Sequence, residues 1–117
     1  MVVGTAVVEL RVHGSRSLKQ KRGVVRSISK RLRNRFNVSV AEVGGQDTWQ
    51  RAVLGLATVA GAAPAARACL ERALDHVEAM HLAESLDQEI HVHALAGEEE
   101  ATLAWDVAPL RGAEEPE

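Results

Sequence analysis

The stretch VELRVHGSRSLKQKR, residues 8–22, passes from one kind of secondary structure into another and decides the fold. From Val2 to His13, apolar and polar residues alternate, which predicts a strand with one buried face. Gly14 ends this alternation. Ser17 and Gln20 then form an S-x-x-Q capping box, in which side chains satisfy free backbone amides of a first helical turn. We therefore expect a strand, a short break, and a helix that begins directly after Ser17.

The rest of the chain adds four more elements. Apolar residues at helical spacing first extend the helix to about Arg35. Two β-rich segments, 37–43 and 49–60, flank the turn signal Gly-Gly-Gln-Asp and predict a hairpin. Pro64 suits the first position of a helix and opens a second amphipathic helix that lacks a side-chain cap. Alternation from Leu86 to Leu95 predicts a fourth strand.

The predicted order is strand, helix, strand, strand, helix, strand, and this order defines a fold class. Two crossover units joined by a hairpin form a four-stranded antiparallel sheet with both helices on one face. This is the ferredoxin-like α+β sandwich, whose second sheet face is open. We expect residues 1–96 to form this domain and the acidic residues 97–117 to form a mobile C-terminal tail.

Length and composition narrow the class of protein. A chain of 117 residues with 46% hydrophobic and 26% charged residues is typical of one small globular domain. No apolar run approaches the ~20 residues of a membrane span, and the first residues lack the basic start of a signal peptide. Cys69 is the only cysteine, which excludes an internal disulfide and a cysteine-based metal cluster. We therefore expect a cytoplasmic protein without membrane contact.

The net charge of −2 hides a strong asymmetry along the chain. Nine of the 14 basic residues lie between Arg16 and Arg35, and no acidic residue occurs between Glu9 and Glu42. Residues 68–117 instead carry 13 acidic residues against two basic ones. Asymmetry of this kind is typical of a polyanion-binding face, of an acidic tail, or of two faces that neutralise each other.

The candidate functional surface is the first helix with the loop before it. At roughly 100° per residue, most cations of the helix align in one row beside its apolar side. Lys21 lies on the apolar side itself, and we expect its ammonium group to reach the loop at Ser15 and Arg16. Free amides of the first turn suit a phosphate group. The predicted phosphate-binding residues are Arg16, Ser17, Lys19, Lys21, Arg22, Arg26, Lys30 and Arg33.

The same cations also fit roles that need no external anion. A row of charge is often only a solvated helix face. The second helix, which lies beside the first in this fold, offers the acids Glu71, Asp75 and Glu78 as internal partners. The acidic tail is a further candidate to compete for the same cations.

Aromatic residues restrict how RNA can bind. RNA-recognition modules of this topology stack bases on aromatic side chains of the first and third strands. The chain has only Phe36, Trp49 and Trp105, and none of them lies in the first strand. Contact between the first helix and the phosphate backbone is therefore the expected mode, with weak sequence preference. Trp49 is either a surface aromatic beside Arg51 that contacts a partner or stacks a base, or a side chain that closes the core over the end of the hairpin; we favour the second.

Three blocks of sequence resemble one known family. The stretches HGSRSLKQKRGVV (13–25), RLRNRFNVSVAEV (31–43) and QDTWQRAVLGLA (46–57) are similar to the YlxP-like family, a bacterial domain of unknown function. The resemblance covers about residues 1–95. It implies a ferredoxin-like fold, a cytoplasmic location and a gene neighbourhood often devoted to translation and ribosome maturation, but no activity. Family members commonly have an acid near Gly45, where this chain has glycine.

Histidines on the open sheet face are a weak candidate for a metal site. His91 and His93 point to one side of the fourth strand, which should pair with the first strand, where His13 lies. Three imidazoles suit zinc or nickel, but alternation alone also places polar residues outside, and Arg11 would repel a cation. We expect no bound metal and no other cofactor.

The sequence shows no Ser–His–Asp or Cys–His pattern, so we expect no enzymatic activity. The leading hypothesis is a non-enzymatic RNA- or ribosome-associated protein that binds phosphate through its first helix. The alternative is a homodimeric protein-interaction or small-ligand-binding module. The third strand favours a homodimer through the open face, because it is apolar on both sides and one side would otherwise face water.

Overall fold

Six elements follow each other in the computed structural model, which describes residues 1–95. They are β1 (Val2–Arg11), α1 (Leu18–Arg35), β2 (Ser39–Gly44), β3 (Arg51–Ala60), α2 (Ala63–Met80) and β4 (Glu84–Ala94). Their order confirms the predicted one, and α1 has the predicted bounds. The tail expected at residues 97–117 lies outside the described residues.

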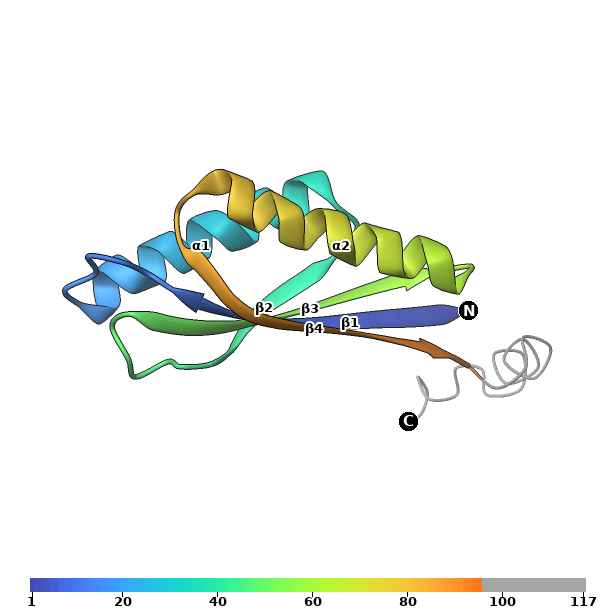
Figure 1. Cartoon of the computed structure of the whole chain (residues 1–117), viewed down its shortest axis with the longest axis horizontal. Coiled ribbons are helices and arrows are strands. Elements are labelled where there is room, and N and C mark those ends of the chain that lie inside the picture. Colours follow the sequence, from blue (N-terminus) through green and yellow to red (C-terminus); the bar gives the residue numbers. More distant parts are fainter. Residues whose placement is uncertain (96–117) are drawn as a thin grey trace, which may run out of the picture.

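The four strands form one antiparallel sheet in the order β2-β3-β1-β4. The central strand β1 pairs with β3 on one side and with β4 on the other. Both helices cover the same face of this sheet, and no helix of residues 1–95 lies on the opposite face (Figure 1). The ferredoxin-like α+β fold expected from the sequence is therefore confirmed.

The first helix begins where the capping box predicts. The Ser17 Oγ accepts a hydrogen bond from the Gln20 backbone N–H at 3.1 Å, and the Gln20 Oε1 accepts one from the Arg16 N–H at 2.7 Å. The return bond thus goes to the residue before the cap and not to Ser17 itself. These two contacts satisfy donors on both sides of the helix start and fix the angle at which the loop enters α1.

The second helix starts without a side-chain cap, also as predicted. Ala62 occupies the cap position, and Pro64 lies in the first turn, one residue after the first helical position. The helix ends at Met80, and the left-handed backbone (φ 55°) of the C-cap residue His81 stops the hydrogen-bond pattern. Within residues 1–95, neither helix is long and apolar enough to cross a membrane.

The hydrophobic core fills the space between the sheet and the two helices. β1 and β3 turn alternate residues toward the helices, as with Val8 and Leu54, which are fully buried. Each helix packs an apolar face against these residues, with Ile28 in α1 and Leu70 in α2. α2 approaches β1 so closely that a Cβ at Gly4 would lie only 2.9 Å from the Leu70 Cδ1. A side chain at this position would require the Leu70 side chain to shift, and the Ala66 Cβ at 3.3 Å leaves little further room.

Trp49 does not close the core, and that prediction is wrong. Its side chain is 53% exposed at the end of the β2–β3 hairpin. The space beneath this hairpin is already occupied by the side chain of Lys21, one of the largest fully buried side chains in the described residues. The indole therefore has no cavity to fill on that side.

Candidate nucleic-acid interface

One flank of α1 carries a row of exposed cations. We define the basic stripe as the residues Arg16, Lys19, Arg22, Arg26, Lys30 and Arg33, all of which are exposed. On a helix with 3.6 residues per turn, the five members within α1 lie on one side, opposite the buried residues Ile28 and Leu32. At 1.5 Å per residue, the row from Lys19 to Arg33 extends over about 21 Å.

Most of the basic stripe has no partner within the described part of the chain. The side chains of Arg16, Lys19, Arg22, Arg26 and Lys30 form no hydrogen bond or ion pair there. Arg33 donates from its Nη1 to the Val40 carbonyl at 3.3 Å. This contact shows that the stripe borders the edge strand β2.

Neutralisation by α2 is not observed. Within residues 1–95 no ion pair joins α1 to the acids of α2, although Phe36 at the end of α1 touches His76 of α2 edge-on, with 5.7 Å between ring centroids. The reason is geometric, because the stripe faces the β2 side and α2 lies on the other flank of α1. Within residues 1–95, the acids of α2 therefore leave the cations of the stripe unpaired.

Ser15 and Ser17 form hydrogen bonds within the loop and the first turn of α1. The Ser15 Oγ donates to the Ser17 carbonyl at 3.1 Å, and the Ser17 Oγ accepts the Gln20 N–H. The Ser17 hydroxyl hydrogen remains as a donor for a phosphate oxygen. Ser17 is half-buried at the start of the stripe.

Lys21 faces a different part of the protein from the one predicted. Its ammonium group does not reach the loop at Ser15 and Arg16, so that expectation is wrong. The Lys21 Nζ donates to the Gly45 carbonyl at 2.5 Å and to the Arg51 carbonyl at 3.1 Å, and it lies 3.0 Å from the Glu42 Oε2. The side chain is fully buried, which removes it from any surface that binds phosphate.

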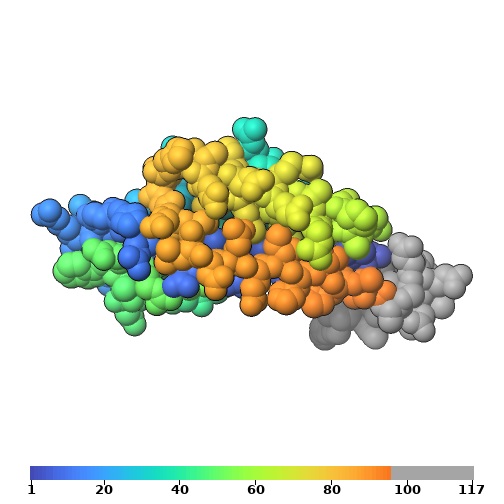
Figure 2. Space-filling view, in the orientation of Figure 1, coloured from blue at the N-terminus to red at the C-terminus, as the bar shows by residue number. Residues whose placement is uncertain are grey.

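The buried lysine explains how α1 and the hairpin stay together. Figure 2 shows the start of α1, in blue, packed against the β2–β3 hairpin, in green, at one end of the molecule. A buried ammonium group is stable only when its donors are satisfied and its charge is paired, and the hairpin supplies both. Gly45 adopts a left-handed backbone (φ 74°) that turns its carbonyl toward the lysine side of the hairpin.

The predicted histidine cluster does not form. His13 lies beyond the end of β1, where its Nε2 is 2.6 Å from the Glu84 Oε1. His91 and His93 stack on each other at 6.2 Å near the opposite end of β1, where they pair with Thr5 and Val3. No group of three histidine, cysteine or acidic side chains suited to a metal occurs in residues 1–95. The antiparallel pairing was predicted correctly, and this direction itself sets His91 and His93 against the start of β1, far from His13.

The open sheet face is apolar at its centre. Val7, Val43 and Val59 are 40%, 56% and 55% exposed on it. A shallow depression of about 350 Å³ lies over β1, β2 and β3, with Gly55 and Ala57 in its floor. Neither β1 nor β3 contains an aromatic residue, so these two strands offer no position on which a base could stack.

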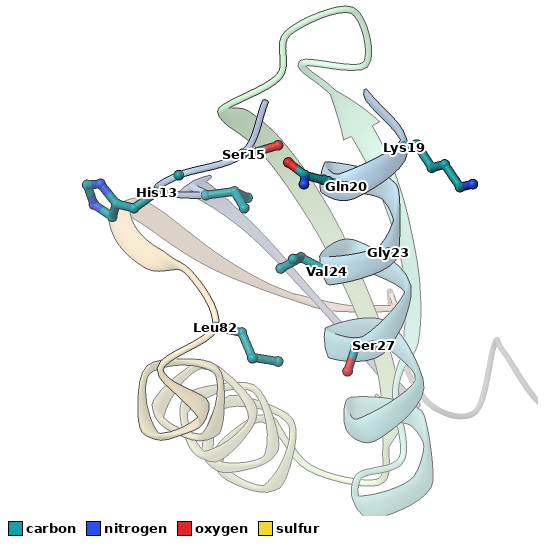
Figure 3. Close-up of a pocket in the computed structure, with 10 residues that line it drawn as sticks. His13, Ser15, Lys19, Gln20, Gly23, Val24, Ser27 and Leu82 are labelled. Carbon is teal, nitrogen blue, oxygen red and sulfur yellow. The ribbon is translucent and has the colours of Figure 1, made fainter. Parts of the chain in front are cut away.

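A second hollow, beside the basic stripe, was missed by the reasoning from sequence. This pocket has a volume of about 610 Å³ and lies between the loop after β1, the first turns of α1 and Leu82 (Figure 3). The sequence does contain one indication of this pocket, which is Gly23. A glycine in a helix interior costs about 1 kcal/mol of stability relative to alanine, so its presence suggests that a side chain is unwanted there. The contribution of Leu82, from a distant part of the chain, has no signal in the local sequence.

The element order and the sheet define an α+β protein of ferredoxin-like fold. Residues 3–90 match the family described as Protein of unknown function (DUF503), and the chain belongs to this family. It is 39% identical over 77 residues to the Uncharacterized protein YlxP of Bacillus subtilis (strain 168), an alignment that covers 66% of this chain and 84% of that protein. The resemblance to a YlxP-like family is therefore confirmed.

Two solved structures have a similar chain arrangement. The de novo designed protein Foldit4 matches with a TM-score of 0.47 and 12% identity, covering 81% of this chain and 98% of that chain. SnoaB, a cofactor-independent oxygenase from Streptomyces nogalater, matches with a TM-score of 0.47 and 16% identity, covering 81% of this chain and 94% of that chain. Neither name supplies an activity for this chain.

Proposed function

We propose that this protein binds RNA in the cytoplasm, free or within the ribosome, through contacts between the basic stripe and backbone phosphates. The observation that carries the proposal is the row of exposed cations that have no partner in the described part of the chain. Exposed cations far beyond what solubility requires, gathered on one helix, are the electrostatic footprint of a polyanion-binding surface. RNA is favoured over other polyanions by the translation-related gene neighbourhood that the family resemblance implies.

The proposed binding mode involves the backbone and not the sheet. A helix flank that presents only lysine and arginine contacts phosphate oxygens without reading bases. The open sheet face lacks, on β1 and β3, the aromatic residues on which RNA-recognition modules of this topology stack bases. The proposed role is therefore binding without catalysis, with little preference for sequence along the stripe.

Fluorescence anisotropy with labelled ribosomal RNA fragments tests this function. The variant Lys19→Glu/Arg22→Glu/Arg26→Glu reverses three charges of the stripe, and we expect it to lose most of its affinity. The matched control Arg11→Glu/Arg67→Glu/Arg72→Glu makes the same change in net charge at exposed positions outside the stripe. Equal loss in both variants would contradict a specific role of α1, because it would leave only a general effect of net charge.

A second candidate function, homodimerisation, is favoured by the open sheet face. An apolar centre of this kind, with valines up to 56% exposed, suits burial by a partner surface. A two-fold dimer places the same patch against itself, so a patch whose rim holds charges of both signs can complement itself. The rim of this face does so, with Arg11 of β1 and the acidic Asp87 of β4 among its exposed residues. A second copy of the chain is therefore the proposed occupant.

A further inference from the structure

The pocket beside α1 has the size and lining of a ligand site. Its volume of about 610 Å³ lies within the range of roughly 300–1,000 Å³ that is usual for small-molecule sites. Val24 of α1 and Leu82 of the turn between α2 and β4 supply apolar walls, and both are half-buried (Figure 3). These apolar side chains are partly exposed to water, so binding a flat apolar group against them would bury apolar surface and lower the free energy.

Gly23 keeps this pocket open. It lies in the middle of α1 without a positive φ, so the backbone does not require glycine there. An added Cβ would meet no atom within 4 Å, so packing does not require it either. Most residues would stabilise the helix at this position, yet any longer side chain would fill the pocket that Gly23 lines.

Hydrogen-bond donors border the apolar walls. The Gln20 Oε1 is occupied by the Arg16 N–H, which leaves the Gln20 amide N–H groups as donors. The Ser27 hydroxyl lines the pocket and has no protein partner in residues 1–95. A flat group with polar edges would find both apolar contact and hydrogen bonds here.

The pocket and the basic stripe meet at Lys19. This residue lines the pocket through its position on α1, while its side chain extends away from the pocket toward the stripe (Figure 3). Arg16 and Arg22 lie one turn or less from Lys19 along the same surface. A ligand with a flat polar-edged part and an attached phosphate fits this combination.

We propose that the pocket takes one unstacked base of the bound RNA strand, while the phosphates beside that base contact Arg16, Lys19 and Arg22. This inference rests on the proposed function and adds a base site to the backbone contacts. Proteins that read single-stranded RNA hold splayed bases between side chains and satisfy their edges with hydrogen bonds. Val24 and Leu82 provide the contact, and Gln20 and Ser27 provide the donors.

A comparison of normal and abasic RNA tests the base site. The probes are a short labelled single-stranded RNA and an abasic strand of the same length and charge, titrated by fluorescence anisotropy at one salt concentration. We expect the wild-type protein to bind the base-bearing strand about tenfold more tightly. Gly23→Leu should abolish this ratio without weakening the abasic strand, because leucine fills the pocket and leaves the stripe intact. Gly23→Ala, which adds one methyl group in open space, should keep the ratio.

The possible results separate the two proposals. Equal binding of both strands by the wild type, or an unchanged ratio in Gly23→Leu, overturns the base site and leaves the stripe as the binding surface. If Gly23→Ala also loses the preference for the base-bearing strand, the base site is overturned, since the effect would then come from the helix and not from the pocket. If neither strand binds at low salt, the proposed function is overturned together with the base site. Thermal unfolding of both glycine variants checks that they remain folded.

Discussion

The Lys21 ammonium group lies 3.0 Å from the Glu42 carboxylate, which joins the first helix to the edge strand β2 through a buried ion pair. The lysine side chain is fully buried, and the glutamate side chain is 18% exposed. Hairpin carbonyls complete the coordination of the ammonium group. Lys19, just before Gln20, is therefore exposed to water, while Lys21, just after it, joins α1 to the hairpin.

Lys21→Met should destabilise the fold and leave RNA affinity unchanged under native conditions. Removal of one partner of a buried pair typically costs about 3–5 kcal/mol, because the remaining groups stay buried without a counter-charge. Urea unfolding measures this loss. The control Lys19→Met should do the reverse, with a stability change below ~0.5 kcal/mol and weaker RNA binding. Unchanged stability in Lys21→Met would show that the buried pair contributes little.

Two glycines should respond oppositely to alanine. Gly23→Ala should stabilise the protein by up to about 1 kcal/mol, because the helix interior prefers alanine and the new methyl group meets nothing. Gly45→Ala should destabilise it by more than about 1 kcal/mol, because φ is 74° and the Cβ would lie 3.0 Å from the Arg51 carbonyl oxygen. Differential scanning calorimetry reports both shifts. Changes of the same sign would contradict this assignment.

Deletion of residues 98–117 should tighten RNA binding. This segment carries seven acidic residues against one arginine, so its charge opposes an approaching phosphate backbone and competes for the basic stripe. Anisotropy titrations of the full chain and the shortened chain, at the same salt concentration, measure the effect. Equal affinities would dismiss competition by the tail, whereas weaker binding would give the tail a supporting role.

Val7→Lys/Val59→Lys should dissociate a homodimer formed through the open sheet face. Both valines lie on the bare face, and paired lysines would bring like charges into the apolar centre of a two-fold interface. Sedimentation velocity over a range of concentrations gives the oligomeric state. The control Ala65→Lys/Ala79→Lys adds the same charges at exposed positions of α2 and should leave the dimer intact. A wild-type chain that sediments as a monomer throughout would exclude this interface.

The elements themselves could be predicted because their signals are local. Ser17 and Gln20 mark the start of α1 within four residues of sequence, and alternation in β1 and β3 shows which residues face the helices. The order of the elements then leaves few possible topologies. The exposure of the five stripe cations within α1 follows from the helical period alone, so it too was predicted correctly.

The errors concern contacts between distant segments. The position of Lys21 on the helix was clear, but the carbonyl groups that hold it belong to residues at least 24 positions further along the chain. The separation of His13 from His91 follows from the antiparallel direction of β1 and β4, which sets the end of β4 against the start of β1. The exact register, which shifts between Glu9 and Leu10, is what the residue types do not reveal.

The salt dependence of RNA binding tests the central claim most directly. Five cations of the basic stripe have no partner in the described residues, and about five phosphate contacts give a slope of log K against log salt near −3.5 for a single strand. The account predicts such a slope for the wild type and a much shallower one, with lower affinity, for Lys19→Glu/Arg22→Glu/Arg26→Glu. A wild-type slope near zero, or an equally steep slope in the variant, would contradict the assignment of phosphate binding to α1.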